Sequence, residues 1–363
     1  MPKMKVYLVV VVLAYLASAL PCLAAHWAWV EQEVAPIPWA NDYDLATFMV
    51  FDQSDDKLTL ITFDFQTTIV QVWKFTAPEW IMVWEGIPDI GDISPWYYFS
   101  YLANIYFDEN LNSIVLWGFC MGYQFEMGYH ALFKYIPGQG FTRITSHIAI
   151  DSIYVASYPH FSITFDVKRR RAVFVGGFTK WMDGQYQFIT VEYDGSTLYY
   201  IPNNPDPPEA VAAFADGSCG YDPSIERVVF YGRQDTSWPL ETWEYDGQRW
   251  KLIATNEGPR LNYPPIGMIY VADHSGLLAL PNDWGAIESW VYRLRKWHKS
   301  TVNGQFEGRV HGLLAYDKNR RVAVFYGGLD EFVKFSNRMW ELRCTKHCKP
   351  VSKPRIPEEG CDE

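Results

Sequence analysis

Side chains able to do acid–base or metal chemistry are spread along this chain without the spacing of a known catalytic motif. Carboxylates are adjacent at Asp55-Asp56 and at Glu358-Glu359, and glycoside hydrolysis uses a pair of carboxylates. Neighbouring acidic residues are equally typical of solvated turns. The sequence has no Gly-rich phosphate loop, no His-Glu-x-x-His motif and no Gly-x-Ser-x-Gly turn. We therefore name no catalytic residue and expect neither a metal nor a cofactor, although an enzymatic activity stays open.

The compartment in which the chain folds is indicated by its first 25 residues. Lys3 and Lys5 precede an apolar run over residues 6–20, and small residues follow at Ala24 and Ala25. This arrangement is typical of a cleaved secretory signal, and the run is shorter than the roughly 20 residues that cross a bilayer. We predict an exported protein, secreted or periplasmic, that does not insert into a membrane.

Export decides how the cysteines are interpreted, because an oxidising compartment favours disulfides. Cys344, Cys348 and Cys361 lie in a tail that contains several prolines, and we predict a disulfide among them without fixing the pair. With His347, the first two could also form half of a metal site, which export disfavours. Cys120 and Cys219 lie in expected strands, so we predict that they are buried apolar groups.

The elements that would position any site follow a repeat of about 50 residues. An apolar strand that ends in an aromatic residue and an aspartate recurs five times, and a sixth copy has Val271 where the aspartate would be. Such a period is the signature of a repeat architecture, and six repeats built of strands predict a six-bladed β-propeller. The aspartates of the repeat are Asp52, Asp108, Asp166, Asp222 and Asp317.

Each repeat is expected to supply four antiparallel strands. The aromatic-Asp pair is followed by a polar turn and a second apolar strand, as at residues 58–63. Third and fourth strands are joined at Asp194-Gly195 and at Asp246-Gly247, because Asp-Gly suits the positive φ of a tight hairpin turn. We expect the repeated residues to be structural, with aspartates capping turns and tryptophans packing between blades, namely Trp243, Trp250 and Trp340.

The two ends of the repeat region look complementary. The last repeat has no fourth strand, and residues 26–34 look like a fourth strand that belongs to no repeat. We predict that residues 27–34 pair beside residues 338–342 and complete the last blade, since a ring closed in this way leaves no open edge between its ends. The predicted organisation is a signal at 1–25, a propeller at 26–343 and a tail at 344–363.

The repeated residues resemble the kelch family. Gly-Gly closes a second strand at residues 176–177 and 327–328, and a tyrosine and a tryptophan follow the second strand of the fourth repeat at Tyr245 and Trp250. Together with the period, these positions are similar to kelch repeats, as found in six-bladed kelch propellers and in the central domain of galactose oxidase. The resemblance covers residues 26–343 and implies an all-β, six-bladed kelch-type propeller.

Two kinds of propeller enzyme are the alternatives to a binding role. The copper radical oxidases that the resemblance suggests use two histidines, two tyrosines and a cysteine bonded to a tyrosine ring, whereas the histidines of this chain are scattered singly. Six-bladed glycoside hydrolases of the sialidase type carry Ser-x-Asp-x-Gly-x-x-x-Trp boxes, and none occurs here. A carbohydrate-active or copper radical oxidase-like enzyme therefore stays the second interpretation.

Loop residues outside the repeated core are the candidates for binding. Loops between second and third strands and between blades vary in length, and variable loops on a rigid scaffold commonly carry recognition. Exposed Trp and Tyr side chains suit a sugar ring or a protein partner. We predict an interaction module that binds a glycan or a protein through this loop face, using Tyr123, Phe125, Trp181, Trp238, Arg260 and Trp284.

The charge of the chain limits its partners. The formal net charge is −11, so nucleic acid and anionic membrane surfaces would be repelled. We expect a neutral or cationic ligand and a monomeric protein.

Overall fold

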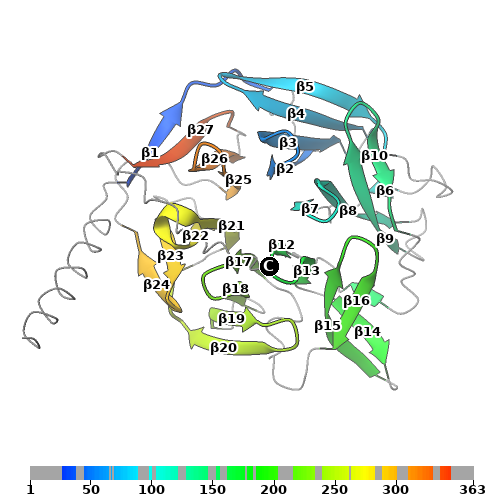
Figure 1. Ribbon diagram of the computed structural model, residues 1–363, viewed down its shortest axis with the longest axis vertical. Coiled ribbons are helices and arrows are strands. Elements are labelled where there is room, and N and C mark those ends of the chain that lie inside the picture. Colours follow the sequence, from blue (N-terminus) through cyan, green and yellow to red (C-terminus); the bar gives the residue numbers. More distant parts are fainter. Residues whose placement is uncertain are drawn as a thin grey trace, which may run out of the picture.

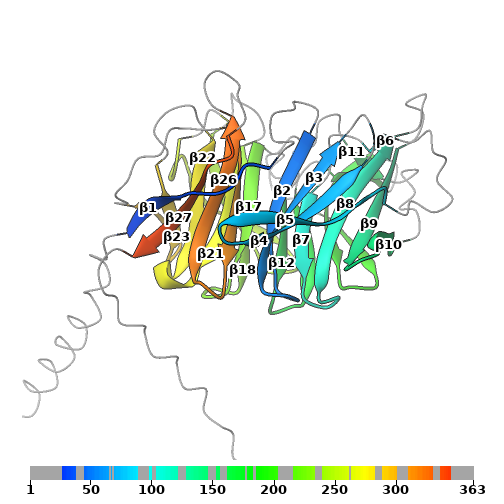
Figure 2. The same cartoon turned by 90° about the horizontal axis from the view of Figure 1, so that it is seen from above.

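The structure, a computed structural model of the chain, describes residues 27–37, 45–64, 67, 69–88, 98–99, 104–121, 128–145, 153–155, 162–175, 178–182, 185–202, 216–233, 239–260, 263–282, 288–300, 310–329 and 336–344. These residues form six sheets set around a ring (Figure 1). Figure 2 shows the ring edge-on, with the blades side by side in one layer. Within the described part of the chain the helical content is one 3-10 turn, Ala272–His274. The predicted all-β, six-bladed architecture is confirmed.

Three blades follow the four-strand pattern within consecutive sequence. Blade 1 consists of β2 (Leu45–Asp52), β3 (Lys57–Asp64), β4 (Val70–Thr76) and β5 (Glu79–Gly86). Blade 4 consists of β17 (Asp216–Asp222), β18 (Arg227–Arg233), β19 (Glu241–Tyr245) and β20 (Trp250–Thr255). Blade 5 consists of β21 (Tyr263–Val271), β22 (Gly276–Asn282), β23 (Trp290–Arg293) and β24 (Lys296–Lys299).

Blades 2 and 3 carry additional strands beyond the repeat. Blade 2 consists of β6 (Tyr98–Phe99), β7 (Asn104–Asp108), β8 (Ser113–Met121), β9 (Gly128–Ile136) and β10 (Gly140–Arg143). Blade 3 consists of β11 (Ile153–Val155), β12 (Ser162–Asp166), β13 (Arg171–Val175), β14 (Phe178–Met182), β15 (Gln185–Tyr193) and β16 (Leu198–Pro202). The additional strand of blade 2 is β6, which pairs with the last residues of β8. In blade 3, β14 pairs with the first residues of β15, and β11 pairs with β14.

Blade 6 combines strands from both ends of the described chain. It consists of β25 (Val310–Asp317), β26 (Val322–Leu329), β27 (Met339–Cys344) and β1 (Trp27–Gln32), in the order β1-β27-β26-β25. β1 pairs antiparallel with β27, with Trp27 opposite Cys344 and Gln32 opposite Met339. The blue β1 and the orange-red β27 lie side by side in Figure 1. Around the ring, the first strands contact one another in the order β2, β7, β12, β17, β21, β25 and back to β2.

The aspartate that ends each first strand is buried and caps the turn that follows. None of the five is more than 5% exposed. Each accepts a backbone N–H bond two or three residues further along, as from Ser54 to Asp52 at 2.9 Å and from Arg320 to Asp317 at 2.9 Å. At the sixth copy Val271 has no acceptor, and the chain forms the 3-10 turn instead. The structural interpretation of the repeated aspartates is confirmed.

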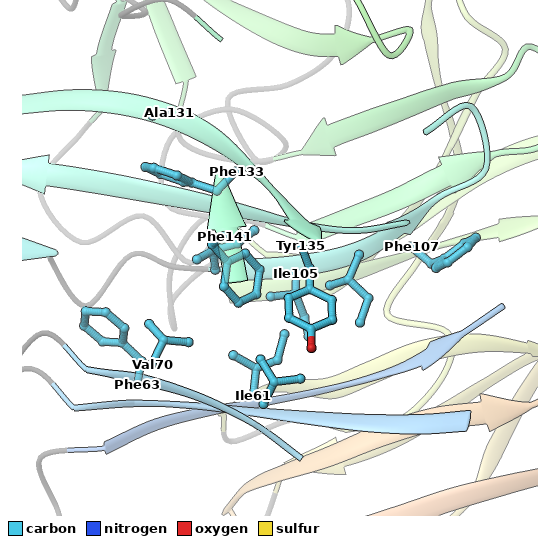
Figure 3. Packing of buried hydrophobic residues seen from close by; sticks show 12 residues of the cluster. Ile61, Phe63, Val70, Ile105, Phe107, Ala131, Phe133, Tyr135 and Phe141 are labelled. Carbon is cyan, nitrogen blue, oxygen red and sulfur yellow. The ribbon is translucent and has the colours of Figure 1, made fainter. Parts of the chain in front are cut away.

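Neighbouring blades pack through clusters of apolar side chains. Figure 3 shows one cluster, in which Ile61, Phe63 and Val70 of blade 1 meet Phe133 and other residues of blade 2. Truncating a large buried side chain in such a cluster to alanine costs about 3–5 kcal/mol. The expected packing role of Trp243, Trp250 and Trp340 is confirmed, since all three are buried.

One cysteine prediction is confirmed and the others stay predictions. Cys219 is a free thiol on β17, only 3% exposed, and burial raises its pKa to about 12. The strand β8 contains Cys120, whose side chain is not among those described. Cys344 ends β27, whereas Cys348 and Cys361 lie outside the described residues. Among the described residues, no helix is long and apolar enough to cross a membrane.

Candidate functional site

The six sequence candidates are placed unevenly. Tyr123, Phe125, Trp238 and Trp284 lie outside the described residues. Arg260 is exposed and follows β20, and Trp181 lies in β14 of blade 3. The described residues therefore bring none of the six candidates together. Of the two candidates that are described, Trp181 lies in a β-strand and Arg260 does not.

The expectation that Trp181 lies in a loop is wrong. β14 pairs with β15 over four residues, from Thr179 opposite Phe188 to Met182 opposite Gln185. Threonine and aromatic residues on both segments suit a pleated strand. Two residues, Asp183-Gly184, separate the paired ends, and Asp-Gly between strands is a strong hairpin signal. Asp183-Gly184 is therefore a sequence signal for this hairpin, although Trp181 was expected in a loop.

The register of this hairpin places four aromatic residues on one face of blade 3. In an antiparallel sheet, directly paired residues share a face, and so does every second residue along a strand. Trp181 is opposite Tyr186, and Thr179 is opposite both Phe188 and Tyr154. By this alternation the strand positions of Tyr154, Trp181, Tyr186 and Phe188 share one face of β11, β14 and β15, and we name these four positions the blade 3 aromatic face.

The blade 3 aromatic face is on the side of its sheet that is turned toward blade 4. Phe188 is two residues before Thr190 on the unbroken strand β15, so both share that side. The hydroxyl of Thr190 accepts a hydrogen bond of 2.9 Å from the indole Nε1 of Trp250, on the outer strand of blade 4. The aromatic face thus continues the seam between blades 3 and 4 on the side of the ring where third strands begin.

Blade 4 contributes a carboxylate on its side of this seam. Glu241 begins β19 and accepts a hydrogen bond of 3.0 Å from Nε1 of Trp243. Trp243 packs in a cluster with Val173 and Val175 of blade 3. Because Glu241 is two residues before Trp243, it lies on the same side of blade 4, facing blade 3. A carboxylate on this side of blade 4 can accept hydrogen bonds from the hydroxyl or amino groups of a ligand.

Carboxylates on the opposite side of the ring are engaged in ion pairs. In blade 3, Arg169 bridges Asp166 and Glu192, with Nε 2.6 Å from Asp166 Oδ2, and Arg171 Nη1 lies 2.8 Å from Glu192 Oε2. Blade 6 repeats this network with Arg320 between Asp317 and Glu341. Such paired carboxylates hold turns together and are not available as an acid–base pair.

Of the adjacent carboxylates seen in the sequence, Asp55 is also engaged in an ion pair, and Glu358-Glu359 lies outside the described residues. Asp55 lies 3.1 Å from Lys74 Nζ, which also contacts the buried Asp52. Among the described side chains, no group of three or more His, Cys, Asp or Glu residues could hold a metal ion.

Comparisons with known proteins show the fold and no family. No family model matches this sequence, and no curated protein matches it. The chain is similar to the GH93 alpha-L-arabinofuranosidase of Fusarium graminearum in complex with arabinobiose, with TM-score 0.54, 9% identity, and 86% of this chain and 97% of that chain covered.

Two further solved structures share the fold. A Hadza microbial sialidase matches with TM-score 0.56 and 12% identity over 84% of this chain and 66% of that chain. A structural genomics protein of unknown function from Bacteroides thetaiotaomicron matches with TM-score 0.50 and 10% identity over 88% of this chain and 77% of that chain. At these identities the likeness establishes the propeller fold alone.

Proposed function

We propose that the protein is an exported binding module that holds a neutral or amino-substituted glycan against the blade 3 aromatic face. The observation that carries the proposal is the register of β14 and β15, which sets Trp181 opposite Tyr186. Aromatic residues combine a flat apolar surface with, in Tyr and Trp, a polar group. That combination suits a sugar ring, which has one apolar face and hydroxyls around its edge.

The size of this face favours a glycan over a protein. Three strands about 4.8 Å apart, each contributing three or four residues, cover roughly 10 Å in each direction. A standard protein interface needs about 800 Å² on each partner, which is several times larger. One or two sugar units match the smaller area.

The charge of the chain supports the same ligand class. A net charge of −11 disfavours polyanions, and Glu241 adds a carboxylate on the blade 4 side of the seam. The solved structures that share the fold include an arabinofuranosidase complexed with a sugar and a sialidase. Their low identity carries no function to this chain, so the proposal rests on the residues.

The proposal keeps the kelch-type interpretation of the repeat. Tyr245 stacks on Trp250 with ring centroids 4.9 Å apart. Gly327 and Gly328, at the end of β26, have φ of 74° and 83°, a conformation that favours glycine. The residues that carry the resemblance therefore do local structural work in blades 4 and 6.

A glycan array with residues 26–363 tests this function. We expect binding to neutral or amino-substituted oligosaccharides that is lost in Trp181→Ala and kept in Tyr199→Ala. Tyr199 lies on β16 of the same blade, opposite Glu192 at the end of β15 far from Tyr186, and its hydroxyl donates a hydrogen bond of 2.7 Å to Asp194. An array without any binding, together with capture of a protein partner that does depend on Trp181, would replace the glycan by a protein ligand.

A further inference from the structure

The strand β1 is attached to blade 5 by two tryptophans as well as to β27 by its backbone. Trp29 is 6% exposed and donates from Nε1 to Ser289 Oγ at 3.0 Å, across the seam between blades 6 and 5. Trp27 packs on His274, with ring centroids 4.2 Å apart at an angle of 38°. One of the two contacts between β1 and blade 5 is therefore made to the side chain of His274.

His274 occupies a site that suits a neutral imidazole. It ends the 3-10 turn between β21 and β22, and its Nε2 is buried without a hydrogen-bond partner. Arg293 on β23 lies close enough to act electrostatically on it, and the Arg293 Nε is also buried without a hydrogen-bond partner. A second ring proton would make the imidazole a cation close to the Arg293 guanidinium, and Nε2 has no hydrogen-bond partner among the described residues.

The other charged groups around this site do not offset a second cation. Asp273, on the same turn, is paired with Arg321 from the turn between β25 and β26. Tyr316 on β25 lies near Asp273 and Arg321 and is neutral at physiological pH. Glu31, further along β1, is held by Arg338.

Burial and the field of Arg293 both oppose protonation. Burial, and secondly Arg293, lower the pKa of His274 from 6.5 to about 4. An imidazolium over Trp27 would gain a cation–π contact, but this gain is outweighed by the lost hydration and the repulsion from Arg293. Between pH 6.5 and pH 4 the protonated state is therefore favoured only when His274 leaves the seam.

We propose that the contact between β1 and blade 5 is an acid-sensitive latch, in which protonation of His274 releases Trp27 and with it the strand β1. Release would free the outer edge of β27 while the inner strands of all six blades remain paired. The latch would thus make the N-terminal strand detachable in an acidic environment without unfolding the ring.

Hydrogen exchange of the β1 amides in residues 26–363 tests the latch. With pKa values of 6.5 exposed and about 4 in the seam, opening of β1 should rise about 20-fold from pH 7 to pH 5, after correction for intrinsic exchange. His274→Phe keeps a ring against Trp27 and removes the proton, so its change should stay below about 2-fold. The control His298→Phe, on the exposed outer strand β24, should respond to acid like the parent.

Three results would overturn the latch. β1 could keep the same protection at pH 5 and pH 7, or His274→Phe could open with acid like the parent. All six blades could also lose protection together, which would make the response global unfolding. If His274→Phe does not fold, an NMR titration of the parent decides, with an expected His274 pKa near 4 and a contradicting value near 6.5.

Discussion

Trp250 of blade 4 donates a buried hydrogen bond of 2.9 Å from its indole Nε1 to Thr190 Oγ1 of blade 3. The next seam repeats the bond, from Trp297 of blade 5 to Thr242 of blade 4 at 2.8 Å. At the following seam Trp29 of β1 bonds Ser289 of blade 5. Three successive fourth strands thus each use a tryptophan to reach a hydroxyl group on the preceding blade, and β1 does so in blade 6 although it comes from the other end of the chain.

Removing one of these indole donors should weaken the ring measurably. Trp297→Phe keeps an aromatic side chain but removes the hydrogen bond to the fully buried Thr242. This loss should lower the free energy of unfolding by about 1 kcal/mol. Thr242→Val should cost a similar amount. Urea unfolding of both single variants and the double variant should give a coupling of about 1 kcal/mol, whereas strictly additive losses would show that the bond contributes nothing.

Deleting β1 should destabilise the ring and expose an edge. A chain that begins at residue 33 lacks the buried Trp29 and leaves β27 unpaired on one side. The loss of Trp29 packing alone should cost about 3 kcal/mol or more, and an open edge promotes association. Thermal unfolding and light scattering measure the two effects, and an unchanged melting temperature would show that β1 does not close the ring.

The buried ion network of blade 3 should be sensitive to loss of its central arginine. Arg169→Gln would remove one of the two arginines that pair with Glu192, whose side chain is 0% exposed, and would leave the ion pair with Arg171. Because Arg169 is itself about a quarter exposed, we expect a loss of roughly 2 kcal/mol, below the 3–5 kcal/mol of a fully buried pair. The adjacent Lys168→Ala removes an exposed pair with Glu226 and should cost less than about 1 kcal/mol. Equal losses in the two variants would contradict this ranking.

The fold could be predicted from the sequence because its repeated features have local causes. An aspartate after an aromatic residue caps its own turn, as Asp52 and Asp317 do, so the repeat can be found without any long-range contact. Asp194-Gly195 was also a correct hairpin signal. Gly195 has the expected positive φ, at 93°. Asp194 itself precedes the turn, and its Oδ1 accepts hydrogen bonds from the backbone N–H groups of Ser196 and Thr197.

The remaining features depend on contacts between residues far apart in sequence. Trp29 and Ser289 are 260 positions apart, and nothing local to either residue indicates the bond. The aromatic face required the pairing of β11 with β14, which brings Tyr154 to Thr179. Four of the six candidate binding residues lie outside the described residues, so their part in a site stays a prediction.

The affinity of the glycan found on the array, measured by calorimetry, tests the proposed function most directly. Stacking of a sugar on Trp181 and Tyr186 should be worth about 0.5–1.5 kcal/mol for each aromatic side chain, so Trp181→Ala and Tyr186→Ala should each weaken binding by about 2- to 12-fold. Tyr199→Ala should bind as the parent does. Parent-like affinity in both aromatic-face variants, or an equal loss in Tyr199→Ala, would show that the ligand does not bind the blade 3 aromatic face.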